Sequence, residues 1–249
     1  MNNNFEEIQS ITIIGGGNVA WLYNHIMKKQ GLDVSCISSR GEIREEELMS
    51  DLIIIAVSDN AIDEVVARLN IKESILVHTS GSMDMEVLNS YAENYGVFYP
   101  LQTISKLVEL NFPNFPMCIE ANNKNTLNSL FSLANKLSDN VYEISSFQRQ
   151  YIHLAAVFAS NFTNHIYGVA KEELKKKDIP FEILFPLIDQ SIEKIKHKNP
   201  FEVQTGPAKR NDSIIMEKHK TMLDEDEREI YEVLSNMIIK KQNSLKQNK

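Results

Sequence analysis

A glycine-rich turn near the N-terminus carries the most specific chemical pattern in the sequence. Residues 15–20 read GGGNVA, which fits G-x-G-x-x-A directly after a short apolar run. The first glycine makes a tight turn, the second lets a pyrophosphate approach the backbone, and the alanine packs the following helix closely. That helix offers unpaired N–H groups to the phosphates. We therefore expect a dinucleotide site here, against the alternative of a purely structural turn. The candidate contacts are Gly15, Gly17, Asn18 and Val19.

The end of the second apolar run bears on which dinucleotide would bind. The chain has Ser38, Ser39 and Arg40 where a site for NAD usually places Asp or Glu against the ribose 2′-hydroxyl. A carboxylate would repel a 2′-phosphate, whereas two hydroxyls and a guanidinium can bind it through charge-assisted hydrogen bonds. These residues favour NADP over NAD, although the acidic run EIREEEL follows closely. The alternative is that Ser39 only begins a loop and Arg40 is solvated.

Small or polar residues follow three further apolar runs, in AVSDN (56–60), HTSGS (78–82) and YPLQT (99–103). In open parallel sheets, ligands bind outside the carboxyl ends of the strands. Three such segments in succession favour a lined crevice over three unrelated turns. The candidate cofactor contacts are Val57, Ser58, Asp59, Thr79, Ser80 and Gly81, and Gln102 is a candidate substrate contact.

The uncharged segment HLAAVFASNFTNHIYG (153–168) supplies the remaining candidates. On a helical wheel its apolar residues gather on one side, which we expect to pack in a helical core, while His153, Ser160, Asn161 and Asn164 gather on another. Such a neutral polar stripe suits a cleft or an interface, where full charges are costly. Imidazole suits acid–base work near neutral pH, so His153 is a candidate proton donor. Asn161 and Asn164 are candidates to hold a substrate carbonyl or carboxylate, with Ser160 beside them. Alternatively, these side chains only form hydrogen bonds across a dimer interface.

The elements that would position these residues fall into two regions. Six short runs, apolar throughout, alternate with helical segments: SITIIG (10–15), DVSCIS (33–38), LIIIAV (52–57), ILVHT (75–79), GVFYP (96–100) and MCIEA (117–121). Such runs are typical of a parallel sheet covered by helices. We therefore predict a doubly wound, Rossmann-type α/β domain over residues 1–146. Helices expected at roughly 146–173, 181–196, 211–222 and 225–240 predict an all-helical domain over residues 147–249.

Composition limits the partners of this 249-residue chain. Acidic residues outnumber basic ones, 34 to 26, and no basic stripe is present, which argues against nucleic acid. The longest apolar run, DLIIIAV, is too short to span a bilayer, and the N-terminus lacks a signal-peptide pattern. Cys36 and Cys118 lack metal or redox spacing, so we expect buried thiols in a cytoplasmic protein. The histidines share no metal-binding spacing, and no metal site is expected.

The segments GGGNVA, AVSDN, HTSGS and FYPLQT together resemble the N-terminal domain of NADP-dependent oxidoreductases of the 6-phosphogluconate dehydrogenase-like superfamily. Pyrroline-5-carboxylate and ketopantoate reductases are among its members. HLAAVFASNFTNH, FPLI and QTGPAKRND resemble one bacterial family in which a Rossmann-like domain precedes a helical domain of unassigned function. The resemblance implies hydride transfer between NADPH and a small carbonyl- or imine-type metabolite. It also implies a homodimer built through the helical domains.

The chain departs from its relatives in the long helix. In hydroxyacid dehydrogenases of the superfamily, a Lys one turn before an Asn contacts the substrate together with it. Asn161 fits that Asn, but Val157 occupies the Lys position, which leaves His153 as the candidate acid. Two alternatives stay open: a ketopantoate reductase, and a dinucleotide-binding or sensing protein without catalytic activity.

Overall fold

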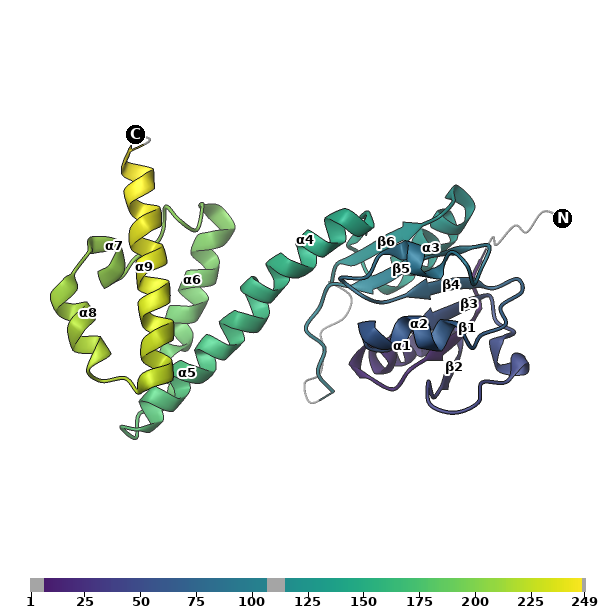
Figure 1. Cartoon of the computed structure of the whole chain (residues 1–249), viewed down its shortest axis with the longest axis horizontal. Coiled ribbons are helices and arrows are strands. Elements are labelled where there is room, and N and C mark those ends of the chain that lie inside the picture. Colours follow the sequence, from purple (N-terminus) through teal and green to yellow (C-terminus); the bar gives the residue numbers. More distant parts are fainter. Residues whose placement is uncertain (1–6, 107–114, 248–249) are drawn as a thin grey trace. The chain divides into compact units, whose positions relative to one another are not determined.

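The computed structural model describes residues 7–106 and 115–247 (Figure 1). Its contacts divide the chain into two compact units, one ending at Asn161 and the other beginning at Phe162. The sequence-based boundary at 146/147 coincides with the start of helix α4 (Ser146–Ala156). The boundary between the compact units lies later, within the same run of helical residues.

The first unit is built on a seven-stranded sheet with the order β2-β1-β3-β4-β5-β6-β7 (Figure 1). The strands are β1 (Ser10–Ile14), β2 (Asp33–Ile37), β3 (Leu52–Ile55), β4 (Ile75–His78), β5 (Tyr95–Pro100), β6 (Met117–Ala121) and β7 (Val141–Glu143). Strands β1 to β5 pair in parallel. The order reverses direction between β1 and β3, which is where doubly wound sheets bind ligands. The predicted Rossmann-type architecture is confirmed.

Both faces of the sheet are covered, which explains why its strands are apolar throughout. In β3, Leu52 and Ile54 belong to one buried cluster, whereas Ile53 and Ile55 belong to the other. Helices α1 (Asn18–Lys29) and α3 (Lys124–Leu137) contribute to the first cluster. Helix α2 (Ile62–Val66) and two short 3-10 helices, Glu45–Leu48 and Met85–Leu88, contribute to the second. A third 3-10 turn, Asp59–Ala61, precedes α2.

The sheet differs from the sequence-based expectation in three respects. Strand β6 runs antiparallel to β5, whereas β7, which was not predicted, pairs in parallel with β6. The three residues of β7 are too few to show a periodic pattern. Cys118 is buried as expected, but Cys36 is exposed because β2 is an edge strand with an incompletely covered face.

The second unit is helical, as predicted. Its elements are α5 (Thr163–Lys175), a 3-10 turn (Phe181–Leu184), α6 (Phe185–His197), α7 (Pro207–Arg210), α8 (Ser213–Lys220) and α9 (Glu225–Gln247). Helix α9 extends seven residues beyond the expected end at residue 240. None of the helices in the described ranges has both the length and the apolar character needed to cross a membrane.

Candidate functional site

A cavity of about 1140 Å³ lies in the first unit, outside the carboxyl ends of the parallel strands. Its volume suits a ligand at or above the size of a typical drug-like molecule. It brings together residues from four strand ends that are far apart in the sequence. All thirteen predicted cofactor residues line it: Gly15, Gly17, Asn18, Val19, Ser38, Ser39, Arg40, Val57, Ser58, Asp59, Thr79, Ser80 and Gly81. Their direct contact with a cofactor stays a prediction.

The glycine turn has the geometry that phosphate binding requires. Gly15 has a φ of +144°, and a Cβ there would lie 2.1 Å from the carbonyl oxygen of Ala56, so only glycine fits. Helix α1 begins after Gly17 without a side-chain cap or an acidic residue in its first turn. Its first N–H groups therefore face the cavity without a side-chain acceptor from the cap residue, at the positive end of the helix dipole.

Two arginines line the part of the cavity that follows β2. The backbone N–H of Arg40 donates to Ser38 Oγ over 3.1 Å, which closes a tight turn. The guanidinium of Arg68 donates to the carbonyl oxygens of Ser39 at 2.5 Å and Gly41 at 3.1 Å. Arg68 therefore fixes the turn that presents Arg40 and adds a second positive charge beside it.

Sequence reasoning missed Arg68. Ala61, Glu64, Val65 and Arg68 all line the cavity. Their spacing is that of one helical face just after the third strand. The sequence alone therefore contains a signal for Arg68 at the cavity.

Several predicted cofactor residues use their side chains to shape the cavity wall. Ser82 Oγ donates to the carboxylate of Asp59, which ties the turn after β3 to the turn after β4. Thr79 Oγ1 donates to the carbonyl oxygen of Ile55 over 3.3 Å. Ser80 Oγ accepts from the N–H groups of Ser82 and Met83 at 3.1 and 3.0 Å. These bonds rigidify the two turns.

Tyr99 and His153 meet at the wall of the same cavity. The Tyr99 hydroxyl lies 3.2 Å from His153 Nδ1, and the two rings are edge-on with centroids 6.3 Å apart. Gly81 packs against this pair so closely that a Cβ would lie 2.5 Å from Nδ1 of His153. Burial raises the pKa of Tyr99 to about 12, so its hydroxyl is protonated at neutral pH and can donate a proton.

Sequence reasoning identified His153 but missed Tyr99, choosing Gln102 from the same segment. The side chain of Gln102 accepts a hydrogen bond from the N–H of Thr103 at 2.8 Å, and it is not among the described residues that line the cavity. The signal for Tyr99 was the alternation of β5, in which Phe98 is fully buried and Tyr99 points to the other side of the sheet.

The polar stripe of the long helix is interrupted by a π-helical segment, Val157–Phe162. A wheel drawn at 3.6 residues per turn loses its register in such a segment. Ser160 and Asn161 lie within it and do not line the described cavity, and Asn164 belongs to the second unit. The apolar residues Phe162 and Ile166, expected in a helical core, are 53% and 36% exposed in the single chain.

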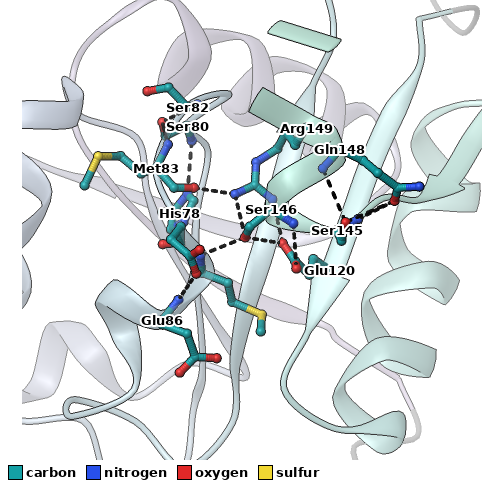
Figure 2. Close-up of polar contacts among 12 residues, drawn as sticks. His78, Ser80, Ser82, Met83, Glu86, Glu120, Ser145, Ser146, Gln148 and Arg149 are labelled. Atoms are coloured by element: carbon teal, nitrogen blue, oxygen red, sulfur yellow. Dashed lines mark hydrogen bonds and ion pairs between the residues drawn. The ribbon is translucent and has the colours of Figure 1, made fainter. Parts of the chain in front are cut away.

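A buried ion pair anchors the start of α4 (Figure 2). The side chain of Arg149 is fully buried, and its Nη1 lies 2.7 Å from Oε2 of Glu120 on β6. The same carboxylate accepts from the N–H of Ser146 at 2.7 Å and from its hydroxyl at 2.6 Å. Nη2 of Arg149 donates to the carbonyl oxygen of Met83, in the loop after β4. One signal in the sequence was a lone arginine in an otherwise neutral helix.

His78 lies at the end of β4, fully buried beside this ion pair. Its Nδ1 accepts from the N–H of Ser80 at 3.2 Å, and its Nε2 lies 3.3 Å from the carbonyl oxygen of Asp84. Burial, helped by the charge of Arg149, lowers the pKa of His78 to about 4. His78 is therefore neutral at physiological pH and braces the loop.

Among the described residues of the second unit, carboxylate oxygens of Glu173, Asp224 and Glu227 lie within 4.8 Å of one another. Lys176 pairs with Glu173 at 2.7 Å and with Asp224 at 2.6 Å. The lysine thus already neutralises much of this charge, as in a surface ion-pair network.

Comparisons with known proteins agree with this architecture. Residues 115–238 match the family described as a domain of unknown function, DUF2520. A comparison with curated protein sequences gives no significant match. A crystal structure from Bacteroides fragilis, described as a "putative NADP oxidoreductase", is 34% identical, with a TM-score of 0.86 over 94% of this chain and 98% of that one.

More distant structures share the fold. A reductive aminase from Aspergillus terreus in complex with NADPH4, cyclohexanone and allyl amine is 11% identical, with a TM-score of 0.68 over 93% of this chain and 92% of that one. The pyrroline carboxylate reductase of Plasmodium falciparum with NADP bound is 12% identical, with a TM-score of 0.57 over 94% and 99%. The 34% identity to the Bacteroides fragilis protein extends over nearly the full length of both chains. The chain therefore belongs to the family of Rossmann-like NADP oxidoreductases with a C-terminal DUF2520 domain.

Proposed function

We propose that the chain is an NADPH-dependent reductase or dehydrogenase that transfers a hydride between the nicotinamide and a small carbonyl- or imine-type metabolite. One observation carries the proposal: a single cavity is lined by the glycine turn, by Arg40 and Arg68, and by the Tyr99–His153 pair. Phosphate-binding, cationic and proton-donating groups are the three sets that such a reaction needs. The bound cofactor supplies the hydride.

The residues present fit the cofactor. Gly15 makes the tight turn that a Cβ would block by clashing with the backbone of Ala56, and the uncapped start of α1 offers N–H groups to a pyrophosphate. Ser38, Ser39 and Arg40 would hold the 2′-phosphate, with Arg68 fixing the turn and adding positive charge. These groups support a preference for NADPH over NADH.

Tyr99 would protonate the substrate. When a carbonyl or imine carbon accepts a hydride, its oxygen or nitrogen gains an electron pair and must take up a proton. The Tyr99 hydroxyl donates that proton, and the resulting phenolate takes a proton from Nδ1 of His153, 3.2 Å away. The imidazole is recharged from solvent, so one proton is consumed for each hydride transferred. The substrate contacts expected of Gln102, Ser160, Asn161 and Asn164 stay predictions, because none of these four residues lines the described cavity.

Nucleotide binding and turnover test the proposal separately. At 100 times its Kd, NADPH would stabilise the fold by about 2.7 kcal/mol. For a chain of this size that raises Tm by roughly 5–10 °C, and NADH should do clearly less. NADPH oxidation is then followed with a panel of 2-keto acids, aldehydes and cyclic imines, with His153→Ala as the control. Absence of stabilisation by either nucleotide would refute the cofactor assignment. Binding without turnover across the panel would indicate a non-catalytic sensor.

A second copy of this chain is the partner in this proposal. Large apolar side chains are exposed on the helices of the second unit, among them Leu187 at 62%, Val233 at 52% and Met237 at 59%. Exposed apolar surface of this kind favours association. Sedimentation velocity should show a homodimer, and a monomer at micromolar concentration would contradict it. The free Cys36 and Cys118 support a cytoplasmic location.

A further inference from the structure

Burial of the Arg149–Glu120 ion pair carries a large desolvation cost for this fold. Arg149 is fully buried and Glu120 is 16% exposed, so both charges lose most of their hydration. The attraction within such a pair often fails to offset that loss, and apolar residues of similar volume frequently stabilise a fold as well or better. Stability alone therefore does not explain the pair.

The pair joins three segments of the first unit at one point (Figure 2). Glu120 on β6 accepts hydrogen bonds from Ser146 and Arg149, both in the first turns of α4. Arg149 reaches the carbonyl oxygen of Met83 in the loop after β4. Ser146 Oγ accepts from the N–H of Met85 at 2.9 Å. Helix α4 is thus fixed both to the sheet and to the loop that carries the cavity residues 79–81.

His153 lies one helical turn beyond Arg149, on the same face of α4. The loop anchored by Arg149 also carries Gly81, which packs against the imidazole. A hydrogen bond weakens steeply beyond about 3.5 Å. At 3.2 Å, the contact between Tyr99 and His153 therefore does not tolerate a sliding of α4 relative to β5.

The charge of Arg149 also reaches Tyr99. Burial raises the pKa of the Tyr99 hydroxyl, whereas the Arg149 guanidinium acts in the opposite direction. A buried cation favours the phenolate that remains after a proton has been given up. The position of Arg149 and its charge therefore both support proton donation by Tyr99.

We infer that Arg149 and Glu120 are positioning residues that hold α4 so that His153 meets Tyr99 at the cavity wall. The inference rests on the proposed function, because the pair that they position is the proton donor proposed above. Arg149 does not line the described cavity and acts through Tyr99 and His153.

The test combines single and double variants. Arg149→Met should lower kcat on the order of 100-fold, the loss that a misplacement of about 1 Å produces. The Kd of NADPH should stay within about two-fold, because Ser39 and Arg40 are untouched. Glu120→Gln, which keeps the size of the side chain, should lower kcat in the same direction, and Arg149→Lys should recover part of the loss. Arg44→Met removes an exposed arginine that pairs with Glu46, and it is the matched control with unchanged kcat.

Non-additivity separates positioning from a general structural role. In a Tyr99→Phe background, Arg149→Met should cost little further activity, since the group that it positions is already gone. Multiplicative losses in the double variant, or full kcat in Arg149→Met and Glu120→Gln, would overturn the inference. If Arg149→Met fails to fold, Glu120→Gln and Arg149→Lys replace it in the same comparison with the Tyr99→Phe background.

Ring-nitrogen NMR of His153 gives a readout that does not depend on turnover. The ¹⁵N shift of Nδ1 should change in Tyr99→Phe, and it should change similarly in Glu120→Gln. An unchanged shift in Glu120→Gln would refute the positioning role even in a protein without activity. Absence of turnover by the wild-type chain, with the shift change present, would refute only the proposed reaction.

Discussion

Alanine at position 81 would place a methyl group 2.5 Å from Nδ1 and 2.8 Å from Cγ of His153. The same methyl group would lie 3.0 Å from Cζ of Tyr99. Ordinary van der Waals contact begins at 3.4 Å, so the imidazole must retreat by roughly 1 Å. The methyl group therefore acts as a wedge against both rings, and the hydrogen bond between them cannot keep its length.

The expected loss follows from that displacement. A misplacement of about 1 Å at a reacting group costs on the order of 100-fold in rate. For Gly81→Ala we expect kcat at saturating NADPH to fall by about that factor. Overpacking at this buried glycine should cost about 1–3 kcal/mol of unfolding free energy, or roughly 2–12 °C in Tm. Steady-state NADPH oxidation and differential scanning fluorimetry measure the two effects.

Gly168→Ala is the matched control. A Cβ at Gly168 meets no atom within 4 Å, and the residue lies within α5. Alanine in a helix is favoured over glycine by about 1 kcal/mol, so this variant should be slightly more stable and fully active. A Gly81→Ala protein that keeps wild-type kcat would show that His153 need not be held against Tyr99.

The other predictions concern the cofactor, the proton donor and stability in acid. Arg40→Glu should weaken NADPH binding about 10- to 100-fold, the value of one or two charge-assisted hydrogen bonds. The Kd of NADH, measured by titration, should change by less than about three-fold. An equal loss of affinity for both nucleotides would contradict a role at the 2′-phosphate. Tyr99→Phe should lower kcat by about 10²- to 10⁴-fold, the range for loss of a general acid. His153→Ala should lower kcat by a smaller factor, because solvent can return the proton to Tyr99. His78 has a pKa of about 4 in the folded chain, below its unfolded value of 6.5. Neutral His78 contributes fully to the stability of the folded chain above pH 6.5. That contribution is lost as the pH falls toward 4, because the unfolded chain then binds a proton that the folded chain does not. That loss should reach about 3 kcal/mol, and urea unfolding should show a flatter pH dependence for His78→Gln.

The fold was largely predictable because burial on both faces leaves a local trace. Strand β3 reads LIII, and each of its residues lies in one or the other buried cluster, so the pattern needs no knowledge of the partners. The direction of β6 leaves no such trace, since an apolar strand reads the same whether it runs parallel or antiparallel to its neighbour. The sequence VFASNF likewise contains no marker of the π-helical segment, so a helical wheel drawn with a constant period loses its register there.

The cavity was predictable for a related reason. The carboxyl ends of parallel strands share one edge of the sheet, so residues that follow each strand must converge there. The contacts that complete the site come from side-chain direction and from pairing across the sequence. Arg68 contacts a turn 27–29 residues away, and Tyr99 meets a histidine 54 residues further along the chain. Local patterns mark Arg68 and Tyr99 as residues that could face the cavity, but they do not encode which distant residues these two contact.

The absent lysine acquires a different meaning once these contacts are known. Val157 stands at the position where related enzymes keep a Lys, and in this chain it begins the π-helical segment. The same helix nevertheless carries a cation, Arg149, eight residues earlier and fully buried. A buried and paired guanidinium cannot give up a proton, but its charge acts on Tyr99, which can. In the proposed mechanism, helix α4 supplies the positive charge and His153, and strand β5 supplies the hydroxyl that donates the proton. Loss of the lysine therefore does not by itself imply loss of proton transfer.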